Sequence, residues 1–173
     1  MWITQTYLGT VEPNASVFIY YLYADYIDEQ VEFTNAVQRS LEKFGESYGS
    51  SVSLLMPNPN YADKIESEVR EIRPVWEHVY DALPGLLIAT TPLNKIEEFA
   101  KECYYLPFGV ELSPYLAAKI ISDARKITDN TLTLKLREHN KEVKSKFRRL
   151  GDSIELKPGL FGFRIDLRKL FLK

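Results

Sequence analysis

Four polar residues that could take part in ligand chemistry stand directly after apolar segments of the chain: Asp25, Asp28, Asn58 and Thr90. In open parallel sheets, ligands bind beyond the carboxyl ends of the strands, because loops and helix N-termini converge there. Carboxylate, amide and hydroxyl groups at such an edge could hold a sugar, a ribose or a cation. The same residue types also form caps and turns for purely local reasons, and we favour that local interpretation.

Other chemistry that the sequence could carry lacks its usual signature. Neither a dinucleotide-binding fingerprint nor a P-loop is present, so the glycines that normally admit a phosphate are missing. Cys103 is the only cysteine, and the two histidines, His78 and His139, are far apart. We therefore predict no disulfide, no metal site and no cofactor. Helical spacing predicts Cys103 as a small core residue rather than a nucleophile, and no acidic residue at motif spacing would orient His78.

One proline carries a resemblance to a known fold. Pro84 precedes the apolar segment Leu86–Ala89 after the order strand, helix, strand, helix. This order resembles a thioredoxin-like fold, which has a cis-proline before a strand at this place. Redox chemistry on that fold requires a Cys-x-x-Cys pair near the start of its first helix, where this chain has Asp25–Asp28. The resemblance thus implies a cysteine-free relative, although an ordinary trans-proline is the general expectation for a turn.

Charge is divided unequally along the chain, and this is the strongest functional signal. Residues 1–111 carry 7 Lys/Arg and 17 Asp/Glu, a net charge of −10, whereas the remaining 62 residues carry 15 and 7, a net charge of +8. A basic C-terminal third predicts binding to something acidic: another protein, a second copy of the chain, or a nucleic acid. Seven cations are the predicted contacts: Lys141, Lys144, Lys146, Arg148, Arg149, Arg164 and Arg168.

The elements that position these residues follow from hydrophobic periodicity. Apolar runs predict strands at Val17–Tyr23, Val52–Met56 and Leu86–Ala89, with an edge strand within Trp2–Leu8. Helical spacing predicts helices around 33–44, 65–79 and 94–103, with a stop at Gly45 and a kink at Pro74. This alternation predicts an α/β domain over residues 1–106, in which helices flank a layered, mainly parallel sheet.

The predicted second part, residues 107–173, is a helix pair followed by a β-hairpin. Ser113 and Pro114 suit a helix start, and Thr128–Asn130 suit its end. A basic amphipathic helix follows, with a narrow stripe of Leu136, Asn140, Val143, Phe147 and Leu150. Alternation over Ile154–Leu167, around a Pro-Gly turn, predicts the hairpin. The seam lies near residues 106–113, and both parts could share one core.

Two further features limit the function. The N-terminus lacks the basic and apolar regions of a signal peptide, and the longest apolar run is far shorter than a membrane span, so we expect a cytoplasmic protein without membrane insertion. The main prediction is a non-catalytic interaction or adaptor module. It would bind an acidic protein surface, or self-associate, through its basic C-terminal region.

Two alternatives to this prediction stay open. The first is nucleic-acid binding through the same cations, because three helices followed by a hairpin match the order of a winged-helix DNA reader. The second is a nucleotide- or sugar-processing enzyme that uses the strand-end residues.

Overall fold

The computed structural model describes residues 2–4, 12–23, 29–57, 61–109 and 113–153. The chain divides into two units, Met1–Leu136 and Arg137–Lys173. The first unit is a mixed α/β body. Of the second unit, the structure describes only the helical residues up to Ser153, so the predicted hairpin at Ile154–Leu167 lies outside the described residues. No helix in the described part of the chain combines the length and apolar character that crossing a membrane requires.

The first unit is built around a five-stranded sheet in the order β1-β3-β2-β4-β5. Its strands are β1 (Trp2–Thr4), β2 (Val17–Leu22), β3 (Val52–Leu55), β4 (Gly85–Ala89) and β5 (Cys103–Pro107). All six residues of β2 are buried, as the run of β-branched and aromatic side chains on both faces predicts. β1 is at one edge of the sheet, which confirms an edge strand near the N-terminus.

The sheet is mixed rather than mainly parallel. β1 and β2 both run parallel to β3, whereas β4 runs antiparallel to β2 and β5 runs antiparallel to β4. Leu22 pairs with Gly85 and Phe18 with Ala89, so the carboxyl end of β4 lies beside the start of β2. Periodicity predicted the strands but not their direction, because a strand buried on both faces has the same apolar pattern in either orientation.

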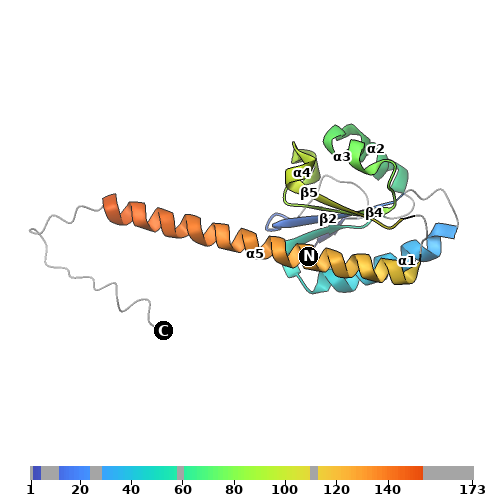
Figure 1. Ribbon diagram of the computed structural model, residues 1–173, viewed down its shortest axis with the longest axis horizontal. Helices are drawn as coiled ribbons and strands as arrows, with labels where there is room; N and C mark the ends of the chain where they lie inside the picture. Colours follow the sequence, from blue (N-terminus) through green and yellow to red (C-terminus); the bar gives the residue numbers. More distant parts are fainter. Residues whose placement is uncertain (1, 5–11, 24–28, 58–60, 110–112, 154–173) are drawn as a thin grey trace, which may run out of the picture. The chain divides into compact units, whose positions relative to one another are not determined.

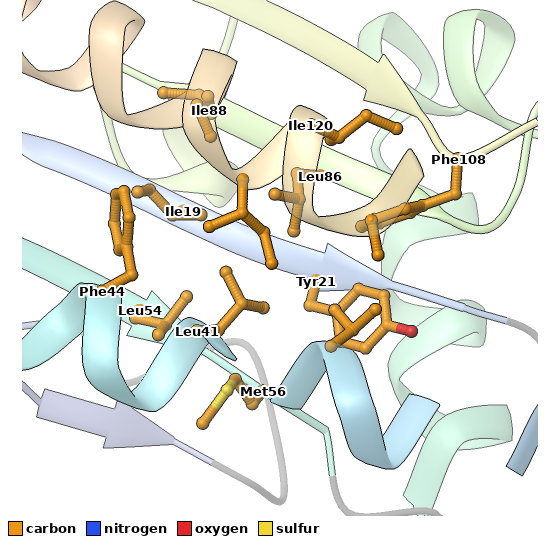
Figure 2. Close-up of a cluster of buried hydrophobic side chains, with 14 of the residues drawn as sticks. Ile19, Tyr21, Leu41, Phe44, Leu54, Met56, Leu86, Ile88, Phe108 and Ile120 are labelled. Atoms are coloured by element: carbon orange, nitrogen blue, oxygen red, sulfur yellow. The ribbon is translucent and has the colours of Figure 1, made fainter. Parts of the chain in front are cut away.

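Two helices cover one face of the sheet: α1 (Glu29–Glu46) and the N-terminal half of α5 (Pro114–Ser153) (Figure 1). Ile19 and Tyr21 of β2 belong to the buried cluster that these two helices form with the sheet. Figure 2 shows Leu41 and Phe44 of α1 on one side of this cluster and Ile120 of α5 on the other. Burying a large aliphatic or aromatic side chain contributes about 1.5–3 kcal/mol, so this layer is a principal source of stability.

The opposite face is covered by α2 (Ala62–Glu71), α3 (Arg73–Val79) and the short α4 (Phe99–Glu102) (Figure 1). Phe18, Tyr20 and Leu22 of β2 form the sheet side of this second core cluster. Two 3-10 turns, η1 (Gly49–Ser51) and η3 (Leu93–Lys95), precede β3 and α4. The Tyr20 hydroxyl accepts a hydrogen bond from the Leu93 amide at 2.9 Å, which ties η3 to the sheet.

The prolines mark the boundaries of two elements. The predicted kink near Pro74 is confirmed, since α2 ends at Glu71 and α3 begins at Arg73, with Ile72 between them outside helical geometry. Pro74 is in the first turn of α3, where no amide hydrogen is needed. The Leu83–Pro84 peptide bond is cis, so the expectation of a trans bond is wrong, and the thioredoxin-like resemblance implied this cis bond.

One helix prediction is wrong in its extent. The helix expected over 94–103 is only α4, and Cys103 begins strand β5 rather than lying on a helical face. Helical spacing over so few residues does not distinguish a short helix from a strand. Gly45 lies within α1, which ends one residue later at Glu46.

The predicted C-terminal helix pair is a single helix, α5, which runs through Thr128–Asn130 without a break. Asp129 and Asn130 are exposed, so they remain solvated within the helix. The hydroxyls of Thr131 and Thr133 donate hydrogen bonds of 2.8 Å to the carbonyls one turn earlier, which lets both threonines stay helical. The start at Ser113 is confirmed by a bond from the Leu116 amide to its hydroxyl at 3.2 Å.

The boundary between the units lies at Leu136 rather than at the predicted seam of residues 106–113. Ala117, Ile120 and Ala124 belong to the core cluster formed with α1 and the sheet. The first half of α5 is therefore an integral part of the α/β body, and the basic second half begins the other unit.

Candidate functional site

Of the four strand-end residues, the structure describes Thr90. Its amide donates a 2.9 Å hydrogen bond to the carbonyl of Glu102, and its hydroxyl donates a weaker one of 3.4 Å to the same oxygen. Its own carbonyl accepts a hydrogen bond from Lys135 Nζ on α5 at 3.2 Å. These contacts hold the chain that leaves β4, which is the local structural role expected of a turn residue.

Asp25, Asp28 and Asn58 lie outside the described residues, but the strands before them are well defined. β2 and β3 are parallel, so their carboxyl ends lie at the same end of the sheet. β4 is antiparallel to β2, so Thr90, which directly follows β4, lies at the opposite end of the sheet. The expectation that all three strand ends converge is therefore wrong, because the carboxyl end of β4 lies opposite to those of β2 and β3.

A small apolar pocket lies near the carboxyl end of β2. It is lined by Leu22, Tyr23, Ile65, Glu66, Val69, Trp76, Val79 and Leu83. Its volume of about 10 Å³ is close to the minimum that holds one water molecule. Ligand pockets usually measure several hundred cubic ångströms, so this space does not accommodate a nucleotide or a sugar.

The charged groups beside this pocket interact with one another. The Glu66 carboxylate, with only 9% of its side chain exposed, forms an ion pair with Arg70 one helical turn later. The Arg70 guanidinium also lies over the Trp76 ring, 5.0 Å from its centroid. This arrangement joins α2 to α3 across the break at Ile72 and gives the carboxylate a structural partner.

The best-organised polar cluster in the described chain surrounds Glu102, and periodicity did not predict it. The carboxylate accepts hydrogen bonds from the Thr91 hydroxyl at 2.6 Å and from the amides of Glu97 and Glu98 at 3.0 and 2.9 Å. These bonds, chiefly the one from Thr91, hold the pKa of Glu102 below its usual value. The Glu102 carboxylate thus accepts hydrogen bonds from backbone amides at the start of α4, as a helix-capping group does.

Cys103 and His78 are in environments that do not suit nucleophilic catalysis. Cys103 is buried in β5, and desolvation raises the pKa of its thiol to about 12, so the thiolate is scarce at neutral pH. His78 Nδ1 lies 3.0 Å from the Pro74 carbonyl, and its ring stacks on Phe99 with centroids 4.3 Å apart. Within the described residues, no three His, Cys, Asp or Glu side chains gather as a metal site would require.

The predicted partner contacts fall on the second half of α5 and beyond. Lys141, Lys144, Lys146, Arg148 and Arg149 all belong to this helix, and the Lys141 side chain is exposed. Arg164 and Arg168 lie outside the described residues. Of the five predicted contacts on this helix, the structure describes the side chain of Lys141 alone.

The winged-helix form of the nucleic-acid hypothesis does not fit this topology. A winged helix needs three separate helices before its hairpin. Here the first of the predicted three is mostly α4 and strand β5, and the other two are one continuous α5. Nucleic-acid binding through the basic residues stays a prediction without that fold.

The chain matches no protein-family model, no curated protein and no solved structure. Its function is therefore inferred from its own residues.

Proposed function

We propose that this protein is a non-catalytic interaction module that binds an acidic protein surface through the basic second half of α5. The observation that carries this proposal is the division of charge between the two units. Unit Arg137–Lys173 holds 11 Lys/Arg and 5 Asp/Glu, a net charge of +6, whereas Met1–Leu136 holds 11 and 19, a net charge of −8. Clustered cations of this kind steer and orient an acidic partner.

The construction of α5 supports this role. Its first half is fixed in the core by Ala117, Ile120 and Ala124, and a hydrogen bond from Lys135 to the Thr90 carbonyl holds it near its middle. A helix that is anchored at one end loses less conformational entropy on binding than a free peptide does. Its second half is therefore suited to present charges in a fixed helical spacing.

The α/β body supports a binding role more than redox catalysis. Its order of strand, helix, strand, helix, cis-proline and strand suits a thioredoxin-like arrangement. The chain has a single cysteine, so the dithiol chemistry of that fold has no second thiol. We propose that the fold serves here as a scaffold for α5.

Binding to a labelled poly-glutamate tests this function directly, with a DNA duplex of equal charge as the comparison. We expect poly-glutamate to bind, with an affinity that falls as salt is added. Preference for the duplex, with a steep salt dependence, would favour the nucleic-acid alternative. Light scattering at low and high salt separates both results from self-association, and the absence of any binding at low salt would reject the proposal.

A further inference from the structure

The second half of α5 has a regular heptad pattern, in addition to its positive charge. Residues at every third and fourth position of this helix are Leu136, Asn140, Val143, Phe147 and Leu150. In heptad notation, Leu136, Val143 and Leu150 occupy d positions, and Asn140 and Phe147 occupy a positions. A 3,4 repeat of this kind is the pattern by which one helix packs along another in a coiled coil.

Charged residues are sorted by heptad position in the same segment. The e and g positions, which flank the a/d stripe, hold Arg137, Lys144, His139 and Lys146, and none of them is acidic. The acidic residues Glu138, Glu142 and Asp152 all fall at the outer c and f positions. Residues at e and g determine partner choice in coiled coils, so this sorting bears on the identity of the partner.

We propose that residues 136–150 of α5 form a two-stranded coiled coil with an acidic partner helix that carries Glu or Asp at its e and g positions. This inference rests on the proposed function and specifies the chemistry of the partner. A second copy of this chain is a poorer partner, because a parallel pairing would place His139 near Lys144, and an antiparallel pairing would also bring basic flanks together.

Asn140 further specifies the partner. A single asparagine at an a position favours two strands and fixes their register, because its amide bonds to a polar residue facing it. Leu136, the first residue of the stripe, has an exposed fraction of 64%, so the stripe begins with an uncovered apolar side chain. We therefore expect a parallel partner with an asparagine opposite Asn140 and aliphatic residues elsewhere on its stripe.

Three synthetic peptides titrated into the full-length chain test this inference. The first has Glu at e and g, Leu at d, and Ile at a except for one Asn facing Asn140. The second replaces Glu with Lys at e and g, and the third has the composition of the first in scrambled order. By fluorescence anisotropy, we expect the first to bind at least about tenfold more tightly than the third. The second should show no binding.

Two matched variants locate the contact. Phe147→Asp places a charge at an a position and should abolish binding of the first peptide. Ser145→Asp makes the same charge change at an f position and should leave the affinity within about twofold. Circular dichroism of both full-length variants checks that the helix and the α/β body are retained. Equal losses in the two variants would overturn the heptad inference.

The remaining outcomes distinguish this inference from the proposed function. If the scrambled acidic peptide binds as tightly as the heptad peptide, acidic docking stands and the coiled coil is wrong. If neither acidic peptide binds at low salt, both are wrong. A dimer of the chain alone that Phe147→Asp dissociates would identify a second copy as the partner, and preference for a DNA duplex would identify a nucleic acid. Either result would overturn the inference that the partner is an acidic helix.

Discussion

The phenol of Tyr48 donates a hydrogen bond to the carboxylate of Asp129, with 2.7 Å between Oη and Oδ1. Tyr48 lies in the turn after α1, and Asp129 lies on α5. The Arg125 guanidinium lies over the Tyr48 ring, 5.9 Å from its centroid, and over the Phe44 ring at 5.3 Å. This cluster fixes α5 on the α/β body shortly before the helix reaches its basic half.

Removal of the Tyr48 hydroxyl should weaken the attachment of α5 to the α/β body. We expect Tyr48→Phe to lower the free energy of unfolding by about 1 kcal/mol, because a partly exposed hydrogen bond to a charged group is screened by solvent. Urea denaturation measures the change. In a double-mutant cycle with Asp129→Asn, the two effects should be non-additive. Tyr80→Phe, at an exposed ring, serves as the control, and purely additive effects of the first pair would contradict this role.

Alkaline pH should destabilise the fold through groups that burial keeps protonated. Desolvation raises the pKa of Tyr20 and of Tyr48 from 10.0 to about 12, and that of Cys103 from 9.0 to about 12. The folded state therefore binds more protons than the unfolded state in this range. The stabilisation is complete below about pH 9 and is lost as the pH rises towards 12.

Urea midpoints measured across this pH range test the prediction. We expect the loss of stability to begin at a higher pH in Cys103→Ala, because the group with the lowest unfolded pKa has been removed. A midpoint that stays constant up to pH 11 in the wild-type chain would contradict this assignment.

Thr128 offers a stabilising substitution. Its side chain is fully buried in α5, and its hydroxyl has no hydrogen-bond partner among the described residues. Because an unsatisfied buried hydroxyl costs about 1–3 kcal/mol, Thr128→Val should raise the unfolding free energy by about 1 kcal/mol at nearly constant volume. Thermal and urea denaturation measure this gain. The control is Thr133→Val, at an exposed position. Equal destabilisation by both variants would indicate a hidden partner for Thr128.

Gly85 should tolerate no side chain. A Cβ atom at this position would lie 2.5 Å from the Tyr105 ring and 2.8 Å from the Leu106 carbonyl oxygen. We expect Gly85→Ala to cost about 1–3 kcal/mol through displacement of β5 from β4. The same substitution should cost less in a Tyr105→Val background, where one of the two clashes is removed. An undiminished cost in that background would place the strain at the Leu106 backbone alone.

Much of the α/β body could be predicted from the sequence, because its strongest signals are local. The runs that form β2, β3 and β4 are mostly apolar at both odd and even positions, as strands buried on both faces are. Pro74 marks the break between two helices. The antiparallel direction of β4 could not be predicted in this way, since it is determined by which strands pair over long sequence distances. That one property separates Thr90 from the carboxyl ends of β2 and β3.

The continuity of α5 was missed for a different reason. Thr128, Asp129 and Asn130 have low helix propensity and resemble a helix end when only local preferences are considered. In the structure, Thr128 is buried and Asp129 bonds to Tyr48, so tertiary contacts retain the helix. The Glu102 cluster was missed although it is local, because hydrogen bonds from Thr91, Glu97 and Glu98 to one carboxylate leave no trace in hydrophobic periodicity.

The most direct test of the central claim compares two triple charge reversals in the binding of poly-glutamate at low salt. One variant changes Lys141, Lys144 and Lys146 to Glu, and its control changes the exposed Lys43, Lys64 and Lys95 of the α/β body to Glu. We predict that the first weakens binding by more than about tenfold and that the control changes it by less than about threefold. Equal weakening by both variants would contradict the claim that the basic half of α5 is the binding element.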